Sequence, residues 1–226
     1  MALAGNQFVP TVYDGTANTV ALIVLLLEFG MLRQALLRGQ VRLYTGQSLA
    51  VSVLAAVVAF HHHVPELYAL ALLSFLLKVI VVPLLVLRLL REAPEEIAGS
   101  GVVGVAGQVL ISIGIGASGF FAVGVLGIHS EVLPTTALSL SVAVVLVAFV
   151  LMIVRRDVVS QAIGFFSLEN GASLASLVVA AGMPLILEVA FLFDLLVAVV
   201  VFGVLIRTHQ RRTLSLSTET LDRLRG

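Results

Sequence analysis

Cysteine is absent from the 226 residues, and charged residues make up only 12% of them. Without cysteine, the chain can form neither disulfides nor iron–sulfur clusters or zinc sites that depend on thiolates. The 13 basic and 13 acidic residues balance to a net charge of zero, so the sequence offers no basic face for nucleic acid. We therefore expect no cofactor in this chain, and any redox chemistry should belong to a partner.

Apolar residues dominate instead, at 60% of the sequence and a mean hydropathy of +1.14. Soluble domains carry about 25% charged residues, so this composition predicts an all-α integral membrane protein. About 20 apolar residues span a bilayer as a helix. Seven windows meet this length: 17–36, 43–60, 66–88, 102–126, 133–154, 158–180 and 184–206. The polar tail beyond them, 213–226, is expected to lie in the cytoplasm.

The basic residues predict the orientation of these spans. With seven spans, every arginine falls on one side of the membrane, in the first, third and fifth connections and after the last span. Because basic residues concentrate in cytoplasmic loops, the N-terminus should be outside and the C-terminus inside. An even number of spans would divide the arginines between both faces.

Ionisable residues also occur at mid-depth in the predicted spans, where a charge costs roughly 2.5–3.5 kcal/mol on insertion scales. Lys78, Glu169 and Asp194 are central in their spans, whereas Glu28 lies in the inner half of the first span and Glu188 near the outer end of the last. Gln47 and Gln108 add uncharged polar groups. Such groups should face other helices, with acidic and basic members pairing or sharing protons.

This arrangement favours a lateral row of proton-carrying groups: Glu169, Lys78, Asp194 and Glu28. The alternative is a static ion pair that only fixes helix packing. Pro83, five residues after Lys78, predicts a local irregularity in that helix, which could admit water. The glycines of "GIGASG", 114–119, are expected to allow close helix packing. No enzyme active site is evident in the sequence.

The segment "VRRDVVSQAIGFFSLENGASL", 154–174, resembles the K subunit of respiratory complex I. Arg155, Arg156 and Asp157 match its Arg-Arg-Asn turn, Ile163 and Gly164 its Ile-Gly, and Asn170 its asparagine. The likeness covers residues 133–212, which we treat as a K-like three-helix segment after an N-terminal four-helix segment, 1–132. The K-subunit glutamate corresponds to Phe166, and Glu169 lies three residues later, on nearly the same helix face but about 4.5 Å further along.

A seven-span chain with K-like helices at its end resembles hydrogenase-4 component E, of group 4 hydrogenases and formate hydrogenlyase-type complexes. "LLKVIVVPLLV", with Lys78 and Pro83, and "LENG" around Glu169 carry this likeness. The resemblance implies a multi-pass subunit of the prokaryotic cytoplasmic membrane, in a complex I-like, proton-translocating oxidoreductase. Its partners would be antiporter-like subunits and subunits that anchor the quinone site or the hydrogenase. Glu169 would be the central proton carrier, and either Glu188 or Asp194 the second family acid, with depth favouring Asp194.

Two other functions remain open on the sequence. The chain could belong to a multisubunit cation/proton antiporter without redox function, or it could be an autonomous seven-helix carrier or sensor. A retinal protein of the latter class would need a lysine in the last helix, which this chain lacks.

Overall fold

The computed structural model describes residues 12–62, 65–91, 103–127 and 134–179, together with 190, 193–194, 196–205 and 208. These residues are helical or form connections, and no strand occurs among them. The helices are α1 (Val12–Arg33), α2 (Leu37–His62), α3 (Pro65–Ser74), the π-helix η1 (Phe75–Val81), α4 (Val82–Arg91), α5 (Val105–Leu126), α6 (Thr135–Val154) and α7 (Val158–Val179). The segments α3, η1 and α4 follow one another without a break and form one rod.

Within the described residues, six helical segments are long and apolar enough to cross a membrane: Gly15–Arg33, Leu37–His61, Leu67–Arg91, Val105–Leu126, Thr135–Val154 and Val158–Val179. They correspond to the first six predicted spans. In the seventh, 184–206, the described part is a shorter apolar helix, Leu196–Leu205. The count of seven, the orientation of the termini and the position of the tail 213–226 therefore stay predictions.

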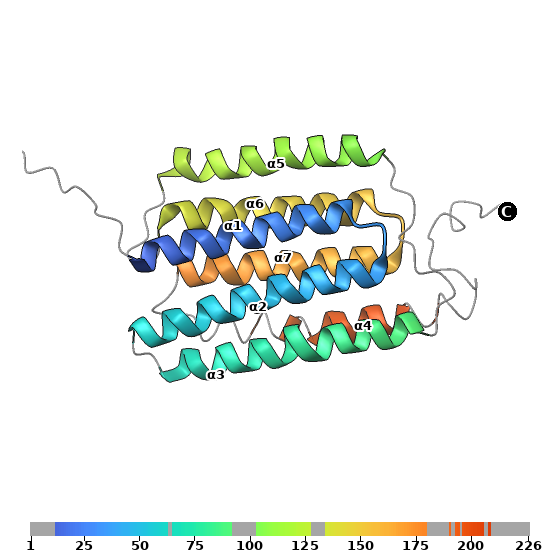
Figure 1. Cartoon of the computed structure of the whole chain (residues 1–226), viewed down its shortest axis with the longest axis horizontal. Coiled ribbons are helices and arrows are strands. Elements are labelled where there is room, and N and C mark those ends of the chain that lie inside the picture. The colour runs from blue at the N-terminus through green and yellow to red at the C-terminus, as the bar shows by residue number, and fades with distance from the viewer. Residues whose placement is uncertain are drawn as a thin grey trace, which may run out of the picture.

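The helices form an elongated bundle with α7 near its centre and α5 at one edge (Figure 1). In the apolar window of α7, 72% of residues are buried, against 22% in α5. The opposite edge is formed by α3, η1 and α4, beside the ribbon of the described residues from 190 onward, drawn in orange to red. Polar side chains on α7 are thus shielded from lipid by the surrounding helices.

Small residues bring the helices into close contact at Gly116 and Gly119, as the glycine pattern predicted, whereas a Cβ atom on Gly114 would meet nothing within 4 Å. A Cβ atom on Gly116 would lie 3.1 Å from a methyl group of Val147, and one on Gly119 would lie 2.5 Å from Leu146. A Cβ on Gly171 of α7 would similarly lie 2.9 Å from Val145. Helix α6 therefore packs closely on both α5 and α7.

A buried arginine holds the α1–α2 and α6–α7 hairpins together at the end where both turns lie. Arg155 is only 6% exposed, and its guanidinium donates to the carbonyl of Leu32 in the last turn of α1 (2.5 Å) and to that of Gln34 just after α1 (3.1 Å). Burial lowers the pKa of Arg155 from its ordinary value, and the carboxylate of Asp157 opposes this. Arg155, which lies in the connection predicted between the spans 133–154 and 158–180, thus has a structural role between two hairpins.

Replacing Arg155 with lysine should lower the free energy of unfolding by about 2 kcal/mol, because a hydrogen bond to a charged group contributes roughly 1.5–3 kcal/mol. Lysine keeps the charge, but its side chain is shorter, so its ammonium group does not reach the position of Nη2 of Arg155, which donates to both carbonyls. Thermal unfolding in detergent measures the loss. Arg42→Lys is the matched control, since Arg42 is exposed, and an equal loss in both variants would contradict this role for Arg155.

Candidate functional site

Two of the predicted relay residues form a buried ion pair in the middle of the bundle. Lys78 Nζ on η1 lies 3.4 Å from Glu169 Oε1 on α7, and the two side chains are 1% and 5% exposed. Lys78 also donates to Ser173 Oγ, one turn after Glu169, at 2.9 Å. The expectation that acidic and basic residues pair at mid-depth is confirmed for these two side chains.

The lysine of this pair sits in a π-helical stretch. Phe75–Val81 forms seven residues of π-helix, and the Val82 amide donates to the carbonyl of Leu77, five residues back. Pro83 follows directly and has no amide hydrogen to donate, so the wider turn accommodates it. The irregularity predicted from Pro83 is thus present, as a π turn that carries Lys78.

Glu28 occupies a second polar cluster, on the other side of α7. It is completely buried on α1, and its Oε2 accepts a hydrogen bond from Gln47 Nε2 of α2 at 2.9 Å and a close one from Ser167 Oγ of α7. Gln47 Nε2 also donates to the carbonyl of Val24, and Gln47 Oε1 accepts from Ser167. Three helices therefore enclose this carboxyl group.

Asn170 extends the Glu28 cluster along α7. Its Nδ2 donates to Gln47 Oε1 at 3.1 Å and to Ser48 Oγ at 2.8 Å. Asn170 is adjacent in sequence to Glu169, whose side chain turns to Lys78. Two neighbouring residues of α7, Glu169 and Asn170, thus belong to different clusters. The carboxyl group of Glu28 on α1 therefore contacts the same helix that carries Glu169.

Sequence reasoning missed a buried tyrosine at the interface of α2 and α7. Tyr44 on α2 is 1% exposed and packs against Phe166 of α7 with ring centroids 5.9 Å apart. It precedes Gln47 and Ser48 by three and four residues and so shares their face of α2. This i, i+3, i+4 spacing of polar residues was the available signal. Gln108, by contrast, lies apart and donates to the carbonyl of Val103.

Asp194 differs from the other predicted relay residues, because its side chain is exposed on this chain. The following helix packs inward through Ala198 and Phe202, whose ring is 5.9 Å from that of Phe166. Asp194 therefore marks the edge of the site, and Glu188 lies outside the described residues.

Several buried oxygens in the site accept no hydrogen bond, namely Oε1 of Glu28, Oδ1 of Asn170 and both carboxylate oxygens of Glu169. Groups of three or more His, Cys, Asp or Glu side chains that could bind a metal ion do not occur among the described residues. The chemistry available here is the holding and exchange of protons between carboxyl, amine and hydroxyl groups.

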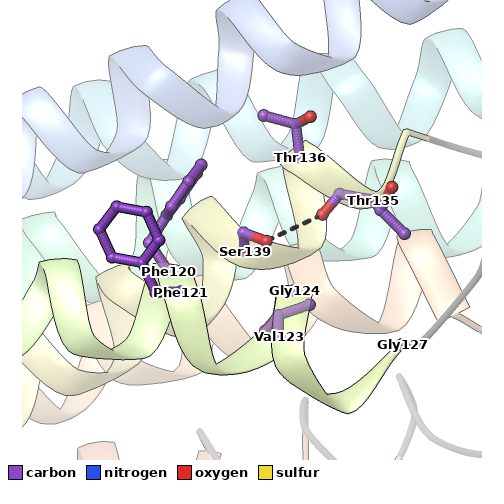
Figure 2. A pocket seen from close by; sticks show the side chains of 8 residues that line it. All are labelled: Phe120, Phe121, Val123, Gly124, Gly127, Thr135, Thr136 and Ser139. Atoms are coloured by element: carbon purple, nitrogen blue, oxygen red, sulfur yellow. Dashed lines mark hydrogen bonds between the residues drawn. The ribbon is translucent and has the colours of Figure 1, made fainter.

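A surface hollow of about 320 Å³ lies apart from these charges, between α5 and α6. Figure 2 shows Phe120 and Phe121 on one side of it and Ser139 donating to the carbonyl of Thr135 on the other. No titratable group is among the described residues that line it. We assign the hollow no part in the site.

Comparison with known proteins identifies the family. Over 170 residues, the chain is 31% identical to the uncharacterized protein Rv0085 of Mycobacterium tuberculosis, covering 75% of this chain and 77% of the relative. The chain belongs to the Rv0085 family. No family profile matches the sequence, and no solved structure is similar to it.

The chain is also distantly related to a hydrogenase subunit. It is 25% identical to hydrogenase-4 component E of Escherichia coli K12 over 183 residues, which cover 81% of this chain and 85% of the relative. The same identity and coverage hold for the Shigella flexneri protein. Together with the apolar helices, this homology indicates a membrane subunit of a hydrogenase-type complex. The likeness to subunit K stays a prediction.

Proposed function

We propose that this chain is a membrane-arm subunit of a complex I-like, redox-driven complex and that it carries protons laterally through the bilayer. Glu169 is the central carrier, Lys78 its exchange partner, and Glu28 and Asp194 the flanking acids. The nickel–iron centre and the iron–sulfur clusters belong to other subunits, since this chain has no cysteine to bind them. We assign any quinone site to other subunits as well. The membrane is the cytoplasmic membrane of a prokaryote, with the N-terminus outside.

The observation that carries this proposal is the Lys78–Glu169 pair. A proton on the Lys78 ammonium group can pass to the Glu169 carboxylate 3.4 Å away, which leaves a neutral amine and a neutral carboxylic acid. Separated charges are costly at this depth, so the neutral and the charged pair are closer in free energy than they are in water. A pair of this kind can release and regain a proton while the chain stays folded.

The homology to hydrogenase-4 component E supports membrane partners, and Asp194 suggests where one of them binds. A carboxylate at mid-depth is not stable against lipid, yet Asp194 is exposed on this chain. We infer that another membrane subunit, antiporter-like or hydrogenase-anchoring, covers this edge with a proton acceptor or a basic group. Protons would then leave Glu169 through Asp194 into that subunit.

Purification of the tagged chain from its native membrane in mild detergent tests the assignment. We expect a hydrogenase-type large subunit and antiporter-like subunits to co-purify, and we expect inverted vesicles containing the complex to acidify their interior during turnover. Antiporter subunits alone would favour the non-redox alternative. A stable monomer without partners would favour the autonomous carrier or sensor and would contradict the proposal.

A further inference from the structure

We propose that Ser167 is the positioning residue of Glu28 and that its hydroxyl group exchanges the roles of donor and acceptor when Glu28 gains or loses a proton. This inference rests on the proposed function, because Glu28 is one of the two flanking acids of that relay. Ser167 is completely buried on α7, two residues before Glu169, and the Glu28 carboxyl group reaches it from α1.

The hydroxyl group of Ser167 lies between two oxygen atoms on two other helices. Serine in a membrane helix often donates to a carbonyl of its own helix, as Ser112 and Ser141 do here with carbonyls four residues back. Ser167 Oγ instead contacts Glu28 Oε2 of α1 and lies 2.9 Å from Gln47 Oε1 of α2. A hydroxyl group has a single hydrogen, so it donates to one of these two oxygens at a time.

The amide group of Gln47 is held in one orientation, which fixes the second of these oxygens. Its Nε2 lies 3.3 Å from the carbonyl of Val24 and 2.9 Å from Glu28 Oε2, and a carbonyl oxygen can only accept. The amide nitrogen therefore faces α1, and the amide oxygen faces α7. There Gln47 Oε1 also accepts from Asn170 Nδ2 at 3.1 Å, so it keeps a donor when Ser167 turns away.

The contacts of the Glu28 carboxyl group indicate which of its oxygens carries the proton. Oε1 is buried and has no hydrogen-bond partner among the described residues, so a proton there would lack an acceptor. A buried donor without an acceptor is costly. Oε2 contacts Ser167 Oγ, which has lone pairs to accept a hydrogen bond. The proton of neutral Glu28 therefore belongs on Oε2.

These contacts give the cluster two complete hydrogen-bond patterns. When Glu28 is ionised, Ser167 donates to its Oε2, and Gln47 Oε1 accepts from Asn170 alone. When Glu28 is protonated, its Oε2–H group donates to Ser167 Oγ, and the serine hydrogen turns to Gln47 Oε1. The two hydrogens of Asn170 Nδ2 keep Gln47 Oε1 and Ser48 Oγ as acceptors in both patterns. Ser167 thus lets a fully buried acid change its charge through the rotation of one O–H bond.

The test is Ser167→Ala in the intact membrane complex. Because only the hydroxyl group is removed, we expect the amount of assembled complex to stay the same while the rate of proton transport falls about tenfold, as for the loss of one hydrogen bond to a charged group. The infrared carbonyl band of protonated Glu28, identified by its loss in Glu28→Gln, should change frequency, because the carboxyl group loses its acceptor. Ser160→Ala is the matched control, since Ser160 is equally buried on α7 but its hydroxyl donates to the amide oxygen of Gln40.

A second variant returns the hydroxyl group. Ser167→Thr should regain most of the transport rate that Ser167→Ala loses. Parental transport or an unshifted Glu28 band in Ser167→Ala would overturn this inference, while the loss in Glu169→Gln left the proposed function intact. Equal losses in Ser167→Ala and Ser160→Ala, or a Glu28 band that is absent at every pH, would overturn it as well. Parental transport in Glu169→Gln would overturn both.

Discussion

Glu169→Gln is expected to lower proton-coupled turnover by about 10²- to 10⁴-fold, the range typical of losing a positioned proton-transfer group. Glutamine has nearly the same volume as glutamate, and its amide oxygen can still accept from Lys78. It cannot release a proton at any accessible pH. Assembly of the complex should therefore be unchanged, and only the titration is lost.

Proton uptake into inverted vesicles measures this loss, normalised to the amount of complex in the membrane. Ser173→Ala is an informative control, because it removes the second hydrogen-bond partner of Lys78 and keeps both ionisable groups. We expect it to retain most of the transport rate. If vesicles with Glu169→Gln pump protons as well as the parent, the relay assignment is wrong and the pair only fixes helix packing.

Lys78→Met is expected to have the largest effect on stability, lowering the free energy of unfolding by about 3 kcal/mol. Removing one member of a buried ion pair costs roughly 3–5 kcal/mol, because the other charge stays buried without compensation. Lys78 is the only cation paired with Glu169 among the described residues, and neither carboxylate oxygen has a hydrogen bond to replace it. Methionine fills a similar volume, so no large cavity contributes.

The double variant Lys78→Met/Glu169→Gln should recover much of this loss, since no charge is left unpaired. Thermal unfolding of the purified chain in detergent, measured for both single variants and the double variant, gives the interaction energy directly. Additive losses would contradict an energetically coupled pair. A double variant that is stable but inactive in transport would separate the structural from the functional role of the pair.

The spans and the mid-depth charges could be predicted from the sequence because hydropathy records them directly. The first six windows agree with observed helices, and Lys78, Glu28 and Glu169 are buried as expected. Pro83 likewise predicted an irregular turn next to Lys78, since its missing amide hydrogen requires one.

The uncharged hydrogen-bonding partners of these residues could not be predicted, because hydropathy does not specify which helix faces which. Serine is tolerated on many surfaces of membrane helices, so Ser167 gave no distinct signal. The spacing of Tyr44, Gln47 and Ser48 marks a polar face of α2 but does not specify that this face meets α7. The exposure of Asp194 could not be predicted either, because hydropathy gives the depth of a side chain and not whether a neighbouring helix covers it. The arginine between the hairpins also escaped prediction, because a positive charge beside a span is usually explained by topology.

The π-helix η1 makes the placement of the lysine depend on chain length. A π turn typically contains one residue more than the α-helix it interrupts, and each residue of an α-helix rotates the chain by about 100°. Deleting a single residue from Phe75–Val81 would leave a rod that still crosses the bilayer, but with one half rotated against the other. Either Lys78 would turn away from Glu169, or α4 would lose the alignment of Val82 and Val86 with the core. The extra residue of the π-helix thus sets the angle between the side chain of Lys78 and the face of α4 that packs on the core. A change in length by one residue there could separate Lys78 from Glu169 without altering any ionisable group.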